Sequence, residues 1–372
     1  YLLRQIIHHL IHQQEVSAKN IFYINFENEK FSFVRNSNDL SDLVEIYLQE
    51  IAESQQKIYF FFDEIQEIDA WEKLVNSYKA DHTIDCEIFI TGSNSKLLSS
   101  ELATYLTGRF VEIPIYPISY EEYLDIKDIA STQDTLLDYL NHSQLPELIQ
   151  EEDLELKHSY IRTIKNSILL NDVVRRFRVE NIDLLEKLFG FLIDNIANPF
   201  SANSIQKAFK QQGYKSNTVT IGNYLRYLEY SFLIYGVDRY DIKGKRILEG
   251  EKKFYLNDLG FRNYLSSSFD PGIGKKLENF VFQKLIMKGY QVYVGNLDSN
   301  LEVDFVAEKA GQKIYLQVAY LLDSEKVIER EYGNLEKIHD NWDKYVVSLD
   351  KVELKPKEGI KHIQAWKLDQ LL

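Results

Sequence analysis

The 372 residues carry a formal net charge of −14, and 45% of them are hydrophobic and 27% charged. This length predicts two or three domains, and the composition excludes a disordered chain. No apolar run reaches the roughly 20 residues that span a bilayer, and no leader pattern opens the sequence. We therefore expect a cytoplasmic protein without a membrane partner.

Charge is distributed unevenly along the chain. Residues 1–125 hold 21 Asp and Glu against 9 Lys and Arg, an acidic surface that repels nucleic acid. Residues 200–253 hold 10 Lys and Arg against 5 Asp and Glu. If DNA is a partner, it binds this second stretch.

Helical and strand-like patterns alternate in the first 125 residues. Helices are predicted at 2–11, 39–53, 71–80 and 96–106, and strands at 21–26, 58–62, 88–91 and 110–115. Helices that alternate with short buried strands are typical of a parallel, doubly wound sheet. Ser119 and Glu122 then form a capping box that opens a further helix at Tyr120. Residues 126–198 read as a helical connector or lid.

Residues 199–262 match the pattern of a winged helix. Two helices are separated by residues 213–217, the second opens near Thr218, and a basic hairpin follows with Gly244 and Lys245 at its tip. In a DNA complex the helix at Thr218 would enter the major groove. Lys243, Lys245 and Arg246 would reach phosphates. The alternative is a module that only packs inside the protein.

Residues 263–372 show a mixed order of elements that predicts a separate α/β domain. The expected elements are a helix at 274–288, strands at 291–294, 302–307 and 313–320, a helix at 325–339 and a strand at 344–349. The fold class is therefore α/β and multidomain, with a parallel, doubly wound sheet in the first domain.

Two adjacent carboxylates, Asp63 and Glu64, end the wholly apolar strand 58–62. This is a Walker B arrangement, in which Asp63 would hold Mg²⁺ and Glu64 would orient the attacking water, since ligands bind beyond the carboxyl ends of parallel strands. The alternative is a strand end capped by solvated acids.

Small polar residues follow the next predicted strand. Thr91 is a candidate cofactor contact, and Ser93 or Asn94 is a candidate sensor of the γ-phosphate. A turn and helix cap explains Ser93 and Asn94 equally well. Arg109 precedes the strand predicted at 110–115 and could point at a phosphate; an exposed structural arginine is the alternative.

These residues resemble the bacterial and archaeal AAA+-type ATPases that carry a C-terminal domain of unknown function. The shared phrases are Asp63-Glu64-Ile65-Gln66-Glu67, Trp71-Glu72, Thr91-Gly92-Ser93-Asn94-Ser95, Leu106-Thr107-Gly108-Arg109 and Pro117-Ile118-Ser119-Tyr120-Glu121-Glu122-Tyr123. The resemblance implies a P-loop NTPase-type parallel sheet in the first domain, ATP and Mg²⁺ as ligands, and a GxxxxGK[ST] loop before the first helix. No such loop stands in the sequence, whose one methionine is Met287, so we expect these residues to lack their native N-terminus and to bind ATP weakly.

The order of Glu278, Asp304 and Gln317 resembles that of the PD-(D/E)xK nucleases, in which such groups hold a divalent metal. Ala319 stands where those enzymes have a lysine, so we expect a degenerate fold without cleavage activity.

Three functions result from these patterns. The first is an ATPase of the intact protein that uses Asp63, Glu64, Ser93 or Asn94, and Arg109. The second is a DNA-binding or partner-binding winged helix with a nucleotide switch that does not hydrolyse. The third, a metal-dependent nuclease, is disfavoured by Ala319. A protein partner or a homo-oligomer is compatible with each.

Overall fold

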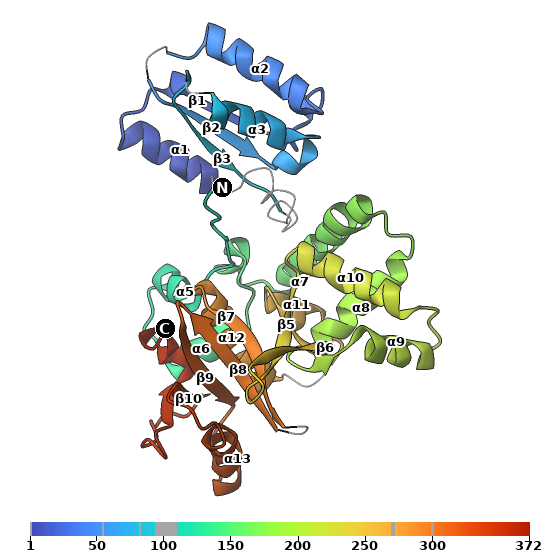
Figure 1. Cartoon of the computed structure of the whole chain (residues 1–372), viewed down its shortest axis with the longest axis vertical. Coiled ribbons are helices and arrows are strands. Elements are labelled where there is room, and N and C mark those ends of the chain that lie inside the picture. The colour runs from blue at the N-terminus through green and yellow to red at the C-terminus, as the bar shows by residue number, and fades with distance from the viewer. Residues whose placement is uncertain (1, 54–55, 82, 94–109, 269–271, 299–300) are drawn as a thin grey trace. The chain divides into compact units, whose positions relative to one another are not determined.

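The computed structural model describes residues 2–53, 56–81, 83–93, 110–268, 272–298 and 301–372. They form two compact units, residues 1–114 and residues 115–372. Figure 1 shows the elements of both units.

The first unit contains a parallel three-stranded sheet in the order β1-β2-β3. Its elements are α1 (Leu2–His12), β1 (Ile21–Asn25), α2 (Ser37–Glu50), β2 (Ile58–Asp63), α3 (Trp71–Ala80) and β3 (Cys86–Ile90), with short 3₁₀ turns at Ala18–Asn20, Glu29–Phe31 and Ile65–Glu67. The predicted parallel sheet with intervening helices is confirmed.

Strand β2 lies at the centre of this sheet and is buried on both faces. Phe60, Phe61 and Phe62 have no exposed surface, because successive side chains point to opposite sides of a strand and helices cover both sides. Phe60 and Phe62 belong to the core that α2 and α3 close, whereas Phe61 packs with Leu3 and Leu10 of α1.

The prediction of a strand at 110–115 is wrong, since these residues form no strand in the structure. The side chains of Val111, Ile113 and Ile115 are 86%, 72% and 68% exposed. Alternating apolar residues favour a strand, but a strand also needs a hydrogen-bonded neighbour, which the sequence pattern does not supply. The helix predicted at 96–106 lies outside the described residues.

The second unit is built on a mixed eight-stranded sheet in the order β11-β10-β9-β8-β7-β5-β6-β4. The strands are β4 (Pro199–Phe200), β5 (Ile234–Asp241), β6 (Arg246–Leu256), β7 (Gln291–Asp298), β8 (Leu301–Lys309), β9 (Gln312–Ala319), β10 (Asp343–Ser348) and β11 (Lys361–Gln364). The helices are α5 (Tyr120–Lys127), α6 (Gln133–Leu140), α7 (Leu154–Ser167), α8 (Ile182–Asp194), α9 (Ala202–Gln211), α10 (Thr218–Tyr230), α11 (Gly260–Leu265), α12 (Ile273–Met287) and α13 (Glu325–Glu336). A π-helical segment, Ile168–Arg175, continues α7, and 3₁₀ turns lie at Pro146–Leu148 and Ala365–Gln370.

Two helices cover opposite faces of the β8–β9 region. Phe305 and Leu316 belong to the large core that contains α12, whereas Val306 and Tyr315 belong to a smaller core with Tyr332 of α13. Because neighbouring residues of a strand face opposite sides, each strand contributes to both cores. Figure 1 shows α12 and α13 flanking these strands.

The helix pair and hairpin predicted in residues 199–262 are present as α9, α10 and β5–β6. The hairpin continues into the C-terminal strands, because β5 pairs in parallel with β7, with Arg239 opposite Val294. One sheet therefore extends across the predicted boundary between residues 262 and 263. The four-part division of the chain, the winged helix and the nuclease-like fold stay predictions.

The helix starts follow from local chemistry. Ser119 and Glu122 form the predicted capping box at the start of α5, and the side chain of Asn217 accepts a hydrogen bond from Thr220 N at the start of α10.

Candidate nucleotide site

Three strand ends of the first unit meet at one edge of the parallel sheet. Asn25 of β1 lies opposite Asp63 of β2, and Phe62 lies opposite Ile90 of β3. Thr91 directly follows β3, and its backbone N donates to Phe62 O at 3.0 Å. The carboxyl ends of parallel strands are where ligands bind in open α/β sheets.

The Asp63 carboxylate accepts hydrogen bonds from three neighbouring side chains. Tyr23 Oη and Asn25 Nδ2 donate to Oδ2 at 2.9 and 3.0 Å, and Thr91 Oγ1 donates to Oδ1 at 2.5 Å. Donors on both oxygens fix the plane of the carboxylate. Asp63 therefore presents an oriented carboxylate at the strand end.

Glu64 lies in a left-handed turn directly after the strand. Its φ and ψ are 58° and 47°, a conformation that costs a residue other than glycine about 1–3 kcal/mol and is concentrated at functional sites. Glu64 N donates to Thr91 Oγ1 at 3.1 Å, and Gln66 Nε2 donates to Glu64 Oε2 at 2.5 Å. Gln66 Nε2 also lies 3.4 Å from Ser93 Oγ.

Of the predicted site residues, the structure brings Asp63, Glu64 and Thr91 into one hydrogen-bonded group and connects Ser93 to it through Gln66. Asn94 and Arg109 lie outside the described residues. Sequence reasoning missed Tyr23, Asn25 and Gln66. The signal for Asn25 was its place at the end of an apolar strand beside β2; the tyrosine gave no comparable signal.

The group fits a hydrated divalent cation. Mg²⁺ keeps several waters and binds through one or two carboxylates, and Asp63 and Glu64 are adjacent carboxylates at one strand end. Gln66 Oε1 is buried and has no hydrogen-bond partner in the described part of the chain. A buried acceptor of this kind needs a donor such as a water molecule. Asp63 would hold the cation, and Glu64 and Gln66 would contact water.

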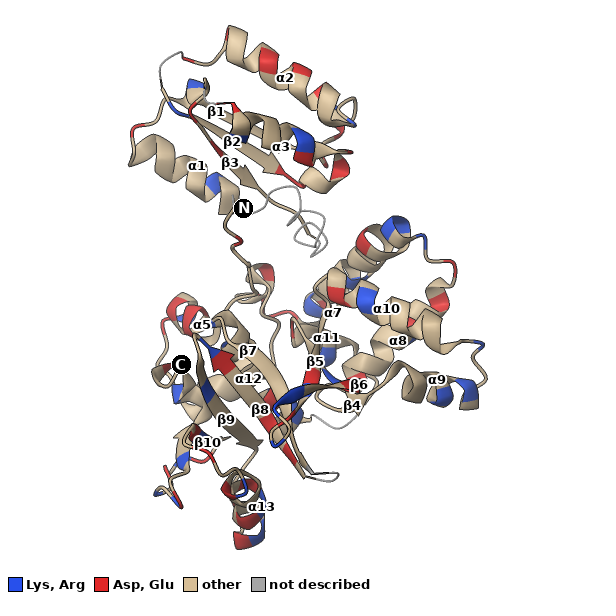
Figure 2. Cartoon of the chain, viewed as in Figure 1, with Lys and Arg blue, Asp and Glu red and all other residues tan. Residues whose placement is uncertain are grey.

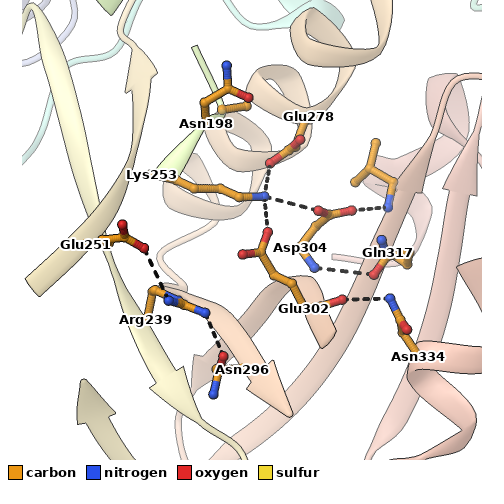
Figure 3. A network of polar contacts seen from close by, with 12 residues as sticks. Asn198, Arg239, Glu251, Lys253, Glu278, Asn296, Glu302, Asp304, Gln317 and Asn334 are labelled. Atoms are coloured by element: carbon orange, nitrogen blue, oxygen red, sulfur yellow. Dashed lines mark hydrogen bonds and ion pairs between the residues drawn. The ribbon is translucent and has the colours of Figure 1, made fainter. Parts of the chain in front are cut away.

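A second polar cluster lies in the second unit and contains Glu278, Asp304 and Gln317. Asp304 N lies 3.4 Å from Gln317 Oε1, and Asp304 Oδ2 accepts a hydrogen bond from Val318 N at 2.9 Å. Lys253 Nζ joins Glu278 Oε1 and Asp304 Oδ1, at 2.8 and 3.3 Å (Figure 3).

Lys253 and Glu302 are the members of this cluster that sequence reasoning missed. Lys253 was counted with the basic residues available to DNA, yet its side chain is only 5% exposed. It lies 2.6 Å from Glu302 Oε1. The sequence contains only a weak indication that these two side chains are in contact, because both residues belong to strands whose pairing the sequence does not reveal.

The candidate DNA contacts are exposed. Thr218 opens α10, and Lys243, Lys245 and Arg246 lie at the tip of the β5–β6 hairpin. Figure 2 shows the basic residues of the chain in blue, including those on this hairpin. Several other basic residues of 200–253 are paired with acids, and these ion pairs are Arg239–Glu251, Lys252–Asp238 and Lys253–Glu278. Arg246 itself lies 3.7 Å from Asp241. The positive charge available to DNA is therefore smaller than the residue count indicates.

The described helices include no segment with the length and apolarity required to cross a membrane.

Comparisons with known proteins match both units. The model of an AAA domain matches residues 1–124, and the model of a domain of unknown function, DUF8612, matches residues 133–272. An uncharacterized protein of Haemophilus influenzae is 36% identical over 358 residues, which are 95% of this chain and 87% of that protein.

A second relative is the uncharacterized protein MJ1544 of Methanocaldococcus jannaschii. It is 33% identical over 351 residues, which are 90% of this chain and 75% of that protein. The crystal structure of protein VC1899 from Vibrio cholerae aligns with 90% of this chain and 78% of that one, at 13% identity and a TM-score of 0.20.

Proposed function

Since the chain belongs to the family of proteins in which an AAA domain precedes a DUF8612 domain, we propose that its first unit, when joined to a phosphate-binding loop, binds ATP with Mg²⁺ and hydrolyses it. The AAA-type match supports a nucleotide-binding fold in general. The roles of individual residues are inferred from their geometry.

The observation that carries the proposal is the position of Thr91 between the two acids. Its hydroxyl donates to Asp63 Oδ1 and accepts from Glu64 N, at 2.5 and 3.1 Å. One side chain thereby fixes both the carboxylate that would hold Mg²⁺ and the backbone that carries the second carboxylate. A solvated strand end would not require such an arrangement.

Each residue then has a defined role. Asp63 would hold the cation directly or through water, and Mg²⁺ at this place would supply positive charge for the phosphate oxygens. Glu64 orients the attacking water and accepts its proton. Gln66 holds the Glu64 carboxylate beside Ser93, which would act as the sensor. Asn94 as an alternative sensor and Arg109 as an arginine finger stay predictions from the sequence.

Phosphate release from ATP by a protein that carries a GxxxxGK[ST] loop before α1 tests this proposal. We expect Mg²⁺-dependent release in the wild type. Glu64→Gln should lower the rate by about 10²–10⁴, the usual contribution of a general base, and retain nucleotide binding. Asp63→Asn should weaken binding of the Mg²⁺ complex.

Glu67→Gln is the matched control, because Glu67 is an exposed acid of the same loop. It should leave the rate unchanged. Hydrolysis by Glu64→Gln at the wild-type rate would remove Glu64 from the mechanism, and the absence of hydrolysis in the wild type would exclude an ATPase.

A second function is supported by the exposed basic tip of the β5–β6 hairpin and the exposed start of α10. We propose that these segments contact DNA phosphates, with Lys243, Lys245 and Arg246 as the charged groups and Thr218 at the start of the helix that would enter the groove. A protein partner or a second copy at the same surface is the other outcome of the binding experiment described in the Discussion.

A further inference from the structure

A buried lysine lies at the centre of the polar cluster in the second unit. Lys253 extends from β6 toward α12 and β8, and its Nζ is 2.8 Å from Glu278 Oε1 and 3.3 Å from Asp304 Oδ1 (Figure 3). Its third partner is Glu302 Oε1, at 2.6 Å. Three carboxylates therefore converge on one ammonium group.

The resemblance to PD-(D/E)xK nucleases implies a divalent metal among these residues, and the structure disagrees. Mg²⁺ binds its ligands at about 2.0–2.1 Å, and the point on which the carboxylates converge is occupied by Lys253 Nζ. A second cation at that point would be repelled by the ammonium. Across the residues that the structure describes, no group of three or more His, Cys, Asp or Glu side chains is arranged to hold a metal ion.

The surroundings keep Lys253 charged. Burial lowers the pKa of Lys253, but the charges of Glu278, Asp304 and Glu302 more than offset this and raise it above its ordinary value. Burial raises the pKa of Glu278 to about 7, although the charge of Lys253 opposes that rise. Tyr255 Oη also donates to Glu278 Oε1, at 2.9 Å, so this oxygen already has two donors.

We propose that the ammonium of Lys253 takes the place of a divalent cation. Glu278, Glu302 and Asp304 then surround this ammonium in the arrangement in which they would otherwise surround a metal ion. The cluster then fastens β6 to α12 and β8 and performs no metal-dependent hydrolysis. Removal of the ammonium, with the carboxylates retained, should convert the cluster into a site for a divalent metal.

Binding of Mn²⁺ to the full chain tests this inference, with free Mn²⁺ measured by electron paramagnetic resonance. All variants carry Asp63→Asn, which removes the proposed nucleotide-associated cation from the measurement. We expect the Lys253→Ala protein to bind one additional Mn²⁺ compared with the protein that retains Lys253. Lys253→Arg, which keeps a positive charge, should gain none.

Two further variants make each outcome decisive. Asp304→Asn added to Lys253→Ala should weaken the new Mn²⁺ site by more than the about 10–100-fold that loss of an outer-shell partner causes, because Asp304 would bind the metal directly. If Lys253→Ala does not fold in the presence or absence of Mn²⁺, Lys253→Ala with Glu278→Gln, which buries one charge fewer, is measured in its place.

The inference is overturned if the protein with Lys253 binds a Mn²⁺ that Asp304→Asn removes, because the cluster then holds a metal beside the lysine. It is equally overturned if the folded protein without Lys253 gains no Mn²⁺. Either result is independent of ATP hydrolysis in the first unit.

Discussion

His362 shows that residue types alone do not identify a catalytic site. Ser348, Asp350 and His362 are the residue types of a hydrolase triad, and Ser348 Oγ lies 2.8 Å from His362 Nε2. Leu354 N donates to His362 Nδ1, so Nε2 carries the proton and donates to Ser348, which in turn donates to Asp350 Oδ2. Because the serine proton points at the aspartate and Ser348 is fully buried, this group stabilises the fold and offers no nucleophile.

The pH dependence of stability should reveal His362. Burial lowers its pKa below 6.5, against the charges of Asp350 and Glu353. The unfolded chain therefore binds the proton at higher pH than the folded chain. The contribution of neutral His362 is fully present above pH 6.5 and is lost as pH falls toward the lowered value, by at most about 1.4 kcal/mol per pH unit.

Chemical unfolding between about pH 5 and 7.5 measures this effect when the wild type is compared with His362→Gln, whose side chain does not titrate. The difference in unfolding free energy between the two proteins should shrink as the solution is acidified. Glu278 acts in the opposite direction, because its raised pKa costs stability as pH rises toward about 7, but it is common to both proteins. A difference that stays constant with pH would contradict the assignment.

Among the elements, the β5–β6 hairpin has a base and a tip that lie in different environments. The hairpin base is part of the large sheet and contains the buried Lys253, whereas its tip at Lys245 is exposed and turns through a left-handed conformation with φ of 52°. The basic stretch of the sequence therefore divides into a structural part and a surface part. Only the surface part is available to a polyanion.

Duplex DNA titrations at several salt concentrations test the surface part. A protein without charge at Lys243, Lys245 and Arg246 should bind more weakly, and the slope of log affinity against log salt should fall by about 0.9 for each phosphate that is no longer neutralised. The matched control neutralises Lys337, Lys351 and Lys355, which are exposed lysines of the same unit. Equal effects of the two triple variants would exclude a specific interaction of the hairpin with DNA.

At the scale of the whole molecule, each of the two units has an apolar core of its own. The core around Phe60 consists of side chains from residues 22–90, whereas the largest core consists of side chains from residues 118–372. Each unit thus has the apolar interior that an independently stable domain requires.

Phe60→Ala should therefore destabilise one unit selectively. Phe60 is fully buried, and removal of a buried phenyl ring costs about 3–5 kcal/mol. Hydrogen exchange measured by mass spectrometry should increase across residues 2–93 and stay unchanged across residues 115–372. Ile46→Ala, at a position 57% exposed on α2, is the control and should change neither region. An equal increase in both units would show that they unfold together.

The local elements and the acids of the candidate site could be predicted from contiguous residues. Helical and strand periodicity placed α1, α3 and β2 almost to the residue, because each pattern reports which side of an element is buried. The apolar strand ending in Asp63 and Glu64 marked the edge of a parallel sheet for the same reason.

Contacts between side chains that are far apart in the sequence could be identified only from the tertiary structure. The contacts of Tyr23 and Asn25 with Asp63 depend on strand pairing, and the pairing of Lys253 with Glu278 joins residues 25 positions apart in the sequence. The prediction of a strand at 110–115 was wrong for the same reason, because a β-strand is stabilised by a partner strand that its own sequence does not contain. Hydrogen bonds and ion pairs between strands are set by register, and register is a property of the assembled sheet.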